Sequence, residues 1–185
     1  MRLYTVQHKL ALDEILNGAN FYCDEKFADV DFKKAYNWLK VQMERILKCK
    51  IPTNLYPIWF HSCIQAFGFE VENQDELDNL FYFKEKDYYL LEFEIPDDML
   101  VMSDYEKWHC VLNNSFLDKG FYKPYDEIEP FKSYSSSEIE ESWKEVFNIS
   151  DTDILDIQIT SPFVNLHWLV KYQPVHQLCK IVQSE

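Results

Sequence analysis

The segment from residue 88 to residue 112 constrains the fold more than any other part of this sequence. Over residues 88–95, bulky apolar side chains alternate with polar ones, as in a strand with one buried face. One side of this strand would carry Tyr89, Leu91, Phe93 and Ile95, and the other would carry Glu92 and Glu94. The Pro-Asp-Asp sequence at residues 96–98 is typical of a tight turn. The segment therefore predicts a strand that contributes one apolar face to the core.

A second short strand and a helix are predicted directly after this turn. Ser103, followed three residues later by Glu106, matches a capping box, in which two side chains satisfy backbone amides at the start of a helix. The helix would carry Tyr105, Trp108, Val111 and Leu112 toward the core. The two asparagines at residues 113–114 end it. We therefore expect a strand–turn–strand–helix unit.

The remaining segments predict further strands and helices in a mixed order. Strands are expected over residues 3–7, 57–61 and 154–160, the last paired with a strand over residues 168–172. Helices are expected over residues 9–16, 31–50, 74–81 and 137–147. This order favours an α+β fold in one domain over residues 1–185, with a mixed or antiparallel sheet and helices packed mainly on one face. Residues 118–137, rich in Lys, Pro, Tyr and Ser, predict a mobile loop.

The composition argues against several classes of function. The 185 residues contain only three glycines, so the glycine-rich loops that hold nucleotide phosphates are not expected. The 18 Lys and Arg are outnumbered by 32 Asp and Glu, and the net charge of −14 repels nucleic acids and anionic membranes but favours basic partners. Thirteen of the acidic residues lie between residues 70 and 107. This pattern fits either an ordinary acidic surface or a docking face for a basic protein.

The cysteines and the hydropathy indicate the compartment. Five cysteines, an odd number without a close pair, are typical of a reducing environment. No apolar run reaches the roughly 18 residues of a membrane span, and the first eight residues lack the apolar region of a signal peptide. We therefore expect a cytoplasmic protein that does not bind membranes.

Two carboxylates and a histidine are the candidate catalytic residues. Glu92 and Glu94 lie two residues apart on one strand, so their side chains point the same way from backbones about 6.5–7 Å apart. Neighbouring carboxylates can share a proton in acid–base chemistry, but alternating charge is also typical of a solvent-facing side of a sheet. His109 is the third candidate, in the helix that follows.

Gln7, Trp59 and His61 are the candidate ligand-binding residues. Trp59 and His61 share one face of a strand that follows a proline, and together they can form the wall of a cleft. Gln7 is a polar residue at the end of the first strand. No metal site is expected, because His61 and Cys63, like His109 and Cys110, lack the short-spaced pairs of structural zinc ligands. The sequence indicates no cofactor.

Five segments form a recognisable pattern: Leu-Tyr-Thr-Val-Gln at residues 3–7, Ala-Tyr-x-Trp-Leu at 35–39, Gln-Met-x-Arg at 42–45, Tyr-Pro-Ile-Trp at 56–59, and the block at 90–113. Together they resemble a bacterial family that is catalogued only as a domain of unknown function. The resemblance covers about residues 2–113 and is most specific around Ser103 and His109. It implies a single intracellular bacterial domain and brings no activity, cofactor or catalytic residues.

Two functions remain open from the sequence. One is a domain that binds a small ligand or a nucleotide derivative, with or without catalysis, in a cleft between residues 4–7, residues 59–61 and the strand with Glu92 and Glu94. The other is a non-catalytic acidic module that binds a basic protein through residues 70–107, as an inhibitor or a nucleic-acid mimic. The surroundings of Glu92 and Glu94 separate them, since a concave pocket favours the first and an open convex face the second.

Overall fold

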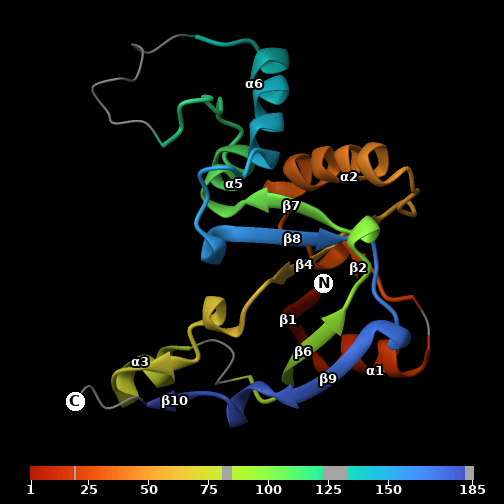
Figure 1. Ribbon diagram of the computed structural model, residues 1–185, viewed down its shortest axis with the longest axis vertical. Helices are drawn as coiled ribbons and strands as arrows, with labels where there is room; N and C mark the ends of the chain where they lie inside the picture. The colour runs from red at the N-terminus through yellow and green to blue at the C-terminus, as the bar shows by residue number, and fades with distance from the viewer. Residues whose placement is uncertain (19, 81–84, 123–132, 182–185) are drawn as a thin grey trace.

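A six-stranded antiparallel sheet lies at the centre of the fold (Figure 1). The computed structural model describes residues 1–18, 20–80, 85–122 and 133–181. In spatial order the strands are β7 (Val101–Asp104), β8 (Ile157–Ser161), β4 (Ile58–His61), β1 (Arg2–His8), β6 (Tyr88–Glu94) and β9 (Leu169–Pro174). The α+β single-domain fold is thereby confirmed. Within the predicted loop over residues 118–137, residues 123–132 lie outside the described ranges.

Short strands and helices surround this sheet (Figure 1). Two strand pairs lie beside it: β2 (Cys23–Asp24) with β3 (Leu55–Tyr56), and β5 (Glu70–Val71) with β10 (Lys180–Ile181). The α-helices are α1 (Lys9–Leu16), α2 (Lys33–Leu47), α3 (Gln74–Asn79), α5 (Tyr105–Leu112) and α6 (Ser136–Ser142). The 3-10 helices are η1 (Glu25–Phe27), η2 (Val30–Phe32), η3 (Ile64–Phe67), η4 (Asp97–Met99), η6 (Trp143–Phe147), η7 (Ile154–Asp156), η8 (Leu166–Trp168) and η9 (Val175–Gln177).

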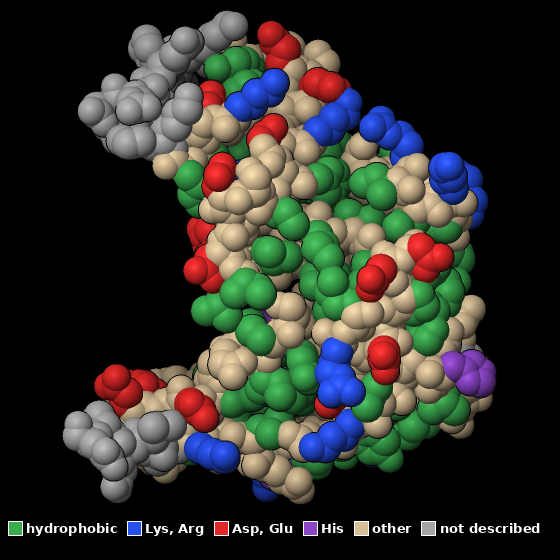
Figure 2. All heavy atoms as spheres, viewed as in Figure 1, with side chains coloured by type: hydrophobic (Ala, Val, Ile, Leu, Met, Phe, Trp, Pro, Cys, Tyr) green, Lys and Arg blue, Asp and Glu red, His purple; other side chains and the backbone are tan. Residues whose placement is uncertain are grey.

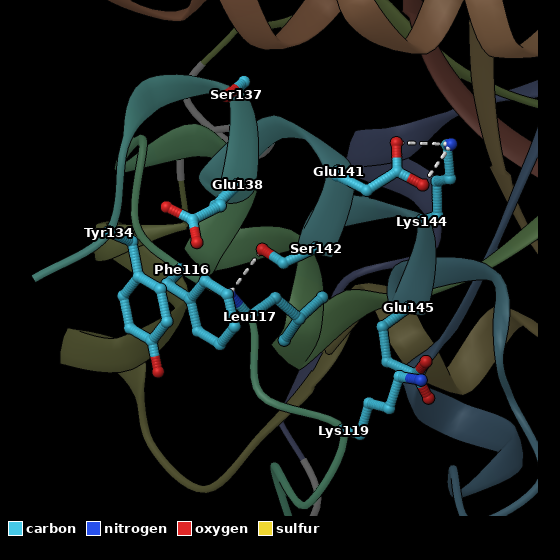
Figure 3. A pocket seen from close by; sticks show the side chains of 10 residues that line it. All are labelled: Phe116, Leu117, Lys119, Tyr134, Ser137, Glu138, Glu141, Ser142, Lys144 and Glu145. Atoms are coloured by element: carbon cyan, nitrogen blue, oxygen red, sulfur yellow. Dashed lines mark hydrogen bonds and ion pairs between the residues drawn. The ribbon is translucent and has the colours of Figure 1, made fainter. Parts of the chain in front are cut away.

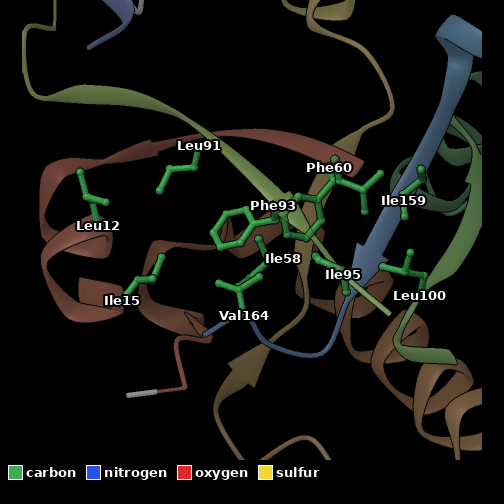
Figure 4. Packing of buried hydrophobic residues seen from close by; sticks show 11 residues of the cluster. Leu12, Ile15, Ile58, Phe60, Leu91, Phe93, Ile95, Leu100, Ile159 and Val164 are labelled. Atoms are coloured by element: carbon green, nitrogen blue, oxygen red, sulfur yellow. The ribbon is translucent and has the colours of Figure 1, made fainter. Parts of the chain in front are cut away.

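One face of the sheet, termed the first face, packs against α1 (Figure 4). Its cluster contains Leu3, Leu12, Ile15, Ile58, Phe60, Leu91, Phe93, Ile95, Leu100, Ile159 and Val164. The alternation predicted for residues 88–95 is confirmed there, because Leu91, Phe93 and Ile95 are fully buried. Full burial of such a side chain stabilises the fold by about 1.5–3 kcal/mol.

The opposite face, termed the second face, carries most of the helices, as the sequence predicted. Its larger cluster joins α2, α5 and η6 to the sheet and contains Ala35, Leu39, Met43, Ile51, Val101, Trp108, Val111, Leu117, Trp143 and Val146. A separate cluster of Phe69, Leu90 and Val175 covers the other half of this face. The core of the second face is therefore divided into two parts.

The predicted pairing of the two C-terminal strands is wrong. β8 lies between β4 and β7, whereas β9 pairs with β6 at the far edge of the sheet. The alternation of apolar residues fixes which side of a strand is buried, but it does not fix which strand lies beside it. Residues 154–156 also form η7 rather than the start of a strand, because Asp153 caps a helical turn there.

The predicted cap of α5 lies one residue too early. Asp104 caps this helix, since its side chain accepts a hydrogen bond from the backbone N–H of Lys107 (2.9 Å). Ser103 belongs to β7, and only 1% of its surface is exposed. Ser and Asp are similarly favoured at this position, so the local sequence does not separate neighbouring candidates. Ser103 is therefore left without a role in capping.

The helices appear in the predicted order; α1 has the predicted bounds, and the others are shorter or subdivided. Residues 30–32 form η2 before α2, and α2 ends where Lys48 adopts a left-handed conformation (φ 52°). The segment predicted over residues 137–147 is divided between α6 and η6. Within the described ranges, no helix combines the length and the apolar character needed to cross a membrane.

Candidate functional site

A row of polar side chains crosses the second face of the sheet. From β7 to β9, the residues paired in register are Ser103, Gln158, His61, Tyr4, Glu92 and Lys171. Directly paired residues on neighbouring strands point to the same side of a sheet. These six residues, one from each strand, therefore form a continuous line, termed the polar row.

Three neighbouring members of the polar row hold buried atoms without a hydrogen-bond partner. They are Ser103 Oγ, Gln158 Oε1 and His61 Nδ1, and no other buried side-chain nitrogen or oxygen in the described part of the chain lacks a partner. A buried polar atom left unpaired costs about 1–3 kcal/mol. All three lie on consecutive strands at one register position. These three atoms are therefore available to a hydrogen-bond partner from outside the chain, an internal water or a ligand.

His61 lies in surroundings that keep its ring neutral. The ring contacts Phe67 edge to face, with the ring centroids 5.0 Å apart. Burial lowers the pKa of His61 below its ordinary value. A neutral imidazole has one donor nitrogen and one acceptor nitrogen. His61 can therefore accept a hydrogen bond from a ligand, which a protonated histidine cannot do.

The neutral state of His61 gives the stability of the fold a specific pH dependence. Because folding lowers the pKa of His61, the unfolded chain binds a proton more readily than the folded chain. The free energy of unfolding is therefore expected to fall as the pH decreases through about 6.5. Urea unfolding of wild type and His61→Phe at several pH values between about 8 and 5 measures this pH dependence of the free energy of unfolding. The exposed His109→Phe is the control, and equal pH slopes for wild type and His61→Phe would contradict a buried neutral ring.

The strand ends that carry these three residues lie at a hollow in the surface. Figure 2 shows it at the left, between an upper part with α5 and α6 and a lower part with α3 and β10. β7 and β4 end on this side, and β8 begins there (Figure 1). η3 and η7, which adjoin β4 and β8 in the sequence, contact each other. In these two elements Ile64, Ile154 and Leu155 expose 38–67% of their surface, so the rim is partly apolar.

Acidic side chains lie on both sides of the hollow (Figure 2). Asp75, Glu76 and Asp78 belong to α3, in the lower part, and Asp151 and Asp153 precede η7, in the upper part. All five are exposed, and among the described residues none of them forms an ion pair with Lys or Arg. Charges of one sign around a recess concentrate the potential inside it. These five carboxylates therefore favour cations over anions near the hollow, although the exposed Lys180 of β10 lies in the lower part.

The structure places two of the predicted site residues, His61 and Glu92, in the polar row. Tyr4 lies between them, so their backbones are two strand spacings, about 10 Å, apart. The Glu92 carboxylate pairs with Arg2, with 3.1 Å between Oε1 and Nε. Glu94 is exposed at the next position on the same face of β6. Glu92 is therefore held by an arginine and does not contact His61 directly.

The other predicted site residues do not belong to the polar row. Trp59 shares the second face, but its ring packs on Trp108, with the ring centroids 5.1 Å apart, in the larger cluster of that face. Gln7 lies on the first face, where its Nε2 donates a hydrogen bond to Thr5 Oγ1 (3.0 Å). His109 is exposed on α5. The structure does not bring Gln7 and His109 together with the glutamates of β6.

Sequence reasoning missed Ser103 and Gln158 as site residues. Ser103 fits a helix cap, and Gln158 fits the polar side of an alternating strand. One signal was available, because Ser103 lies in the segment where the resemblance to a known family is most specific. The pairing of the two residues depends on strand order, which no local pattern contains.

Asp104, next to Ser103, connects β7 and α5 with the segments that carry Tyr122 and Thr152. Its fully buried carboxylate accepts hydrogen bonds from the hydroxyls of Tyr122 (2.8 Å) and Thr152 (2.5 Å). The buried ammonium of Lys107 lies 3.7 Å from the same carboxylate. Desolvation and the hydrogen bond to Asp104 raise the pKa of Tyr122, so its hydroxyl stays a donor at neutral pH. This network fixes the end of β7 that carries Ser103.

A cavity of about 640 Å³ beside α6 is a weaker candidate (Figure 3). Several of its polar groups already have partners within the chain. Lys144 Nζ lies 2.5 Å from a carboxylate oxygen of Glu141, and Ser142 Oγ accepts a hydrogen bond from the backbone N–H of Leu117 (2.9 Å). A ligand there would compete with these bonds, whereas the atoms of the polar row have no bond to lose.

The cysteines form no disulfide, and four of them are poor nucleophiles. All five are free, and burial raises the pKa of Cys23, Cys49, Cys110 and Cys179, so these thiols are weak nucleophiles at neutral pH. Across the described ranges, no three His, Cys, Asp or Glu side chains are grouped closely enough to hold a metal ion. Hydrogen bonding at the polar row is therefore the chemistry that the described residues offer most clearly.

Comparison with known proteins identifies the family but not an activity. Neither the curated proteins nor the solved structures contain a match to this chain. One family matches residues 2–169, a range that includes Ser103, Gln158 and His61. The predicted resemblance to a family of unknown function is thereby confirmed. The chain belongs to the family DUF3841, described as a domain of unknown function.

Proposed function

We propose that this domain binds a small organic ligand in the hollow, through the Ser103, Gln158 and His61 end of the polar row. The observation that carries the proposal is the occurrence of three buried unpartnered atoms at one register position on three consecutive strands. A ligand that supplies matching groups removes the cost of each unpaired atom. We also propose that the protein acts in the cytoplasm. Its five free cysteines are compatible with that compartment.

The unpartnered atoms define the groups that such a ligand must carry. Gln158 Oε1 and a neutral His61 nitrogen accept hydrogen bonds, and the Ser103 hydroxyl can donate or accept. Amino and amide groups supply the donors, and the exocyclic amines of nucleobases belong to this class. The surrounding carboxylates disfavour phosphates. A nucleoside or another ligand without phosphate groups therefore fits better than a nucleotide.

Non-covalent binding fits this site better than nucleophilic catalysis. Gln158 lies between Ser103 and His61, so the backbones of the serine and the histidine are about 10 Å apart. A nucleophile and its base must approach to about 2.6–3.2 Å. In the structure neither Ser103 Oγ nor His61 Nδ1 has a hydrogen-bond partner, so the two are not bonded to each other, and we assign both residues to recognition.

Ligand-induced stabilisation and NMR shifts test the proposed function. Adenosine, cytidine, nicotinamide and arginine methyl ester, which all carry N–H donors, are the probes. At least one is expected to raise Tm and to shift the amide signals of β4, β7 and β8, and Gln158→Met should abolish both effects because it removes the central acceptor. Gln173→Met is the matched control, since Gln173 is also half-buried but lies on β9. If no probe binds, or if Gln158→Met binds as wild type does, the proposal fails.

An acidic interaction module is the second candidate function. The unpaired carboxylates on both sides of the hollow favour it, because they would attract a basic protein and repel nucleic acids and membranes. The docking face of such a module would be the acidic surface around the hollow. It would not be the whole segment over residues 70–107, which the sequence indicated. These residues are dispersed over β5, α3, β6, η4, β7 and α5, and Asp104 among them is fully buried.

A further inference from the structure

We propose that the ligand of this site is an organic cation with several N–H donors, a guanidinium above all. This inference rests on the proposed function, because it names the ligand class of the same hollow. Three features carry it: the acceptors near the strand ends, the carboxylates on the two sides, and the apolar rim. Each feature alone fits several ligands, and their combination fits an alkylguanidinium.

The acceptors are arranged in a line that suits a planar donor. Neighbouring strands lie about 4.8 Å apart, so Ser103, Gln158 and His61 present oxygen, oxygen and nitrogen atoms from backbones at that spacing. A guanidinium has five N–H donors in a rigid fork and no acceptor, so it can donate to two neighbouring acceptors at once. It is also weakly hydrated, which lowers the cost of leaving water. An ammonium has fewer donors and a tighter hydration shell.

The distribution of charge along and around the polar row favours a cation over a neutral molecule as the ligand. The end of the row at β6 and β9 carries its own cations, because Arg2 pairs with Glu92 and Lys171 is paired in register with Glu92. The end at β7, β8 and β4 contains only uncharged members, and exposed carboxylates of α3 and of the segment before η7 lie on either side of the hollow. An internal water can satisfy the acceptors. A water carries no positive charge, whereas a cation also gains from the exposed carboxylates on both sides, none of which forms an ion pair with Lys or Arg among the described residues.

The rim suits the alkyl part of such a ligand. Ile64 precedes the rest of η3, and Ile154 and Leu155 begin η7, so exposed apolar groups adjoin the two strands that carry His61 and Gln158. Methylene stems of arginine pack along apolar surface while the charged head reaches polar partners. An arginine side chain and a free alkylguanidine share this chemistry, so both are possible sources of the ligand.

Paired probes that differ only in charge test the inference. Acetyl-arginine methylamide is compared with its citrulline counterpart, in which a neutral urea replaces the guanidinium, by calorimetry and by NMR titration at about 50 mM NaCl. We expect the arginine probe to bind at least tenfold more tightly, and Gln158→Met to weaken it at least tenfold. Gln173→Met should leave its affinity unchanged. Asp153→Asn combined with Asp75→Asn should weaken the arginine probe several-fold but not the citrulline probe, because the carboxylates act on charge.

The possible outcomes separate this inference from the proposed function. If both probes bind equally and Gln158→Met abolishes both, the site exists but the cation assignment is wrong. If neither probe nor any nucleoside binds, both proposals fail. Shifts in wild-type spectra do not depend on how the variants fold, and shifts confined to regions away from β4, β7 and β8 would overturn the inference. A comparison of agmatine with a seven-residue arginine peptide identifies the source of the guanidinium. Equal affinities would identify a free small molecule, and a tenfold preference for the peptide would identify a protein segment.

Discussion

Replacing Asp104 by Ala is expected to lower the free energy of unfolding by about 3–5 kcal/mol, because it leaves a buried charge without its partner. The carboxylate is fully buried, and the ammonium of Lys107, also buried, lies 3.7 Å away. The same change removes the cap of α5 and the acceptor shared by Tyr122 and Thr152. Urea unfolding monitored by circular dichroism measures the loss.

Two further variants distinguish the effect of breaking the buried Asp104–Lys107 ion pair from the general effect of removing an acidic residue. Glu106→Ala removes a carboxylate from the exposed side of the first turn of α5 and is expected to change stability by less than about 0.5 kcal/mol. The double change Asp104→Ala with Lys107→Met removes both charges and should recover part of the stability. A loss below about 1 kcal/mol for Asp104→Ala would show that the network does not hold the end of β7 in place.

Replacing Phe93 by Ala is expected to destabilise the fold by about 3–5 kcal/mol through the cavity that it leaves in the core of the first face. Phe93 is fully buried and contacts Phe60 edge to face, with the ring centroids 5.8 Å apart. Figure 4 shows it among side chains from α1 and several strands, so no single element can move to fill the space. Thermal and urea unfolding measure the change.

The matched control for Phe93→Ala is a residue on the same face of the sheet, in the strand at the edge of the sheet. Tyr172 belongs to β9 and exposes 46% of its surface, so Tyr172→Ala should cost much less than Phe93→Ala. Phe93→Leu keeps most of the apolar volume and should fall between the two. Equal losses for Phe93→Ala and Tyr172→Ala would contradict the position of Phe93 at the centre of the core.

The elements that the sequence predicted well are those whose signals are local. The strand over residues 88–95 was predicted with its buried side, because the period of two in a strand does not depend on its neighbours. The order of the helices followed from apolar spacing and from prolines and asparagines at their ends. The cap of α5 was misplaced from Asp104 to Ser103, since neighbouring residues of equal capping preference give the same local signal.

The candidate site was predicted only in part, for a physical reason. His61 was selected because it shares one face of a strand with Trp59, and Glu92 because it lies two residues from Glu94 on one side of a strand. Ser103 and Gln158 carry no such signal, since serine and glutamine are common on the polar side of any strand. Gln7 was selected as well, yet the period of two places it on the opposite face from His61.

The sequence by itself determined the α+β class, the buried side of β6 and the acidic character of the chain, since each follows from composition or from periodicity within a few residues. Only the tertiary structure decided which polar residues meet. His61, Ser103 and Gln158 are separated by more than 40 positions in the chain, and they share a register position because β4, β8 and β7 lie side by side. That order depends on the packing of the whole sheet against its helices, and a shift of one residue in any strand would turn these side chains to the other face.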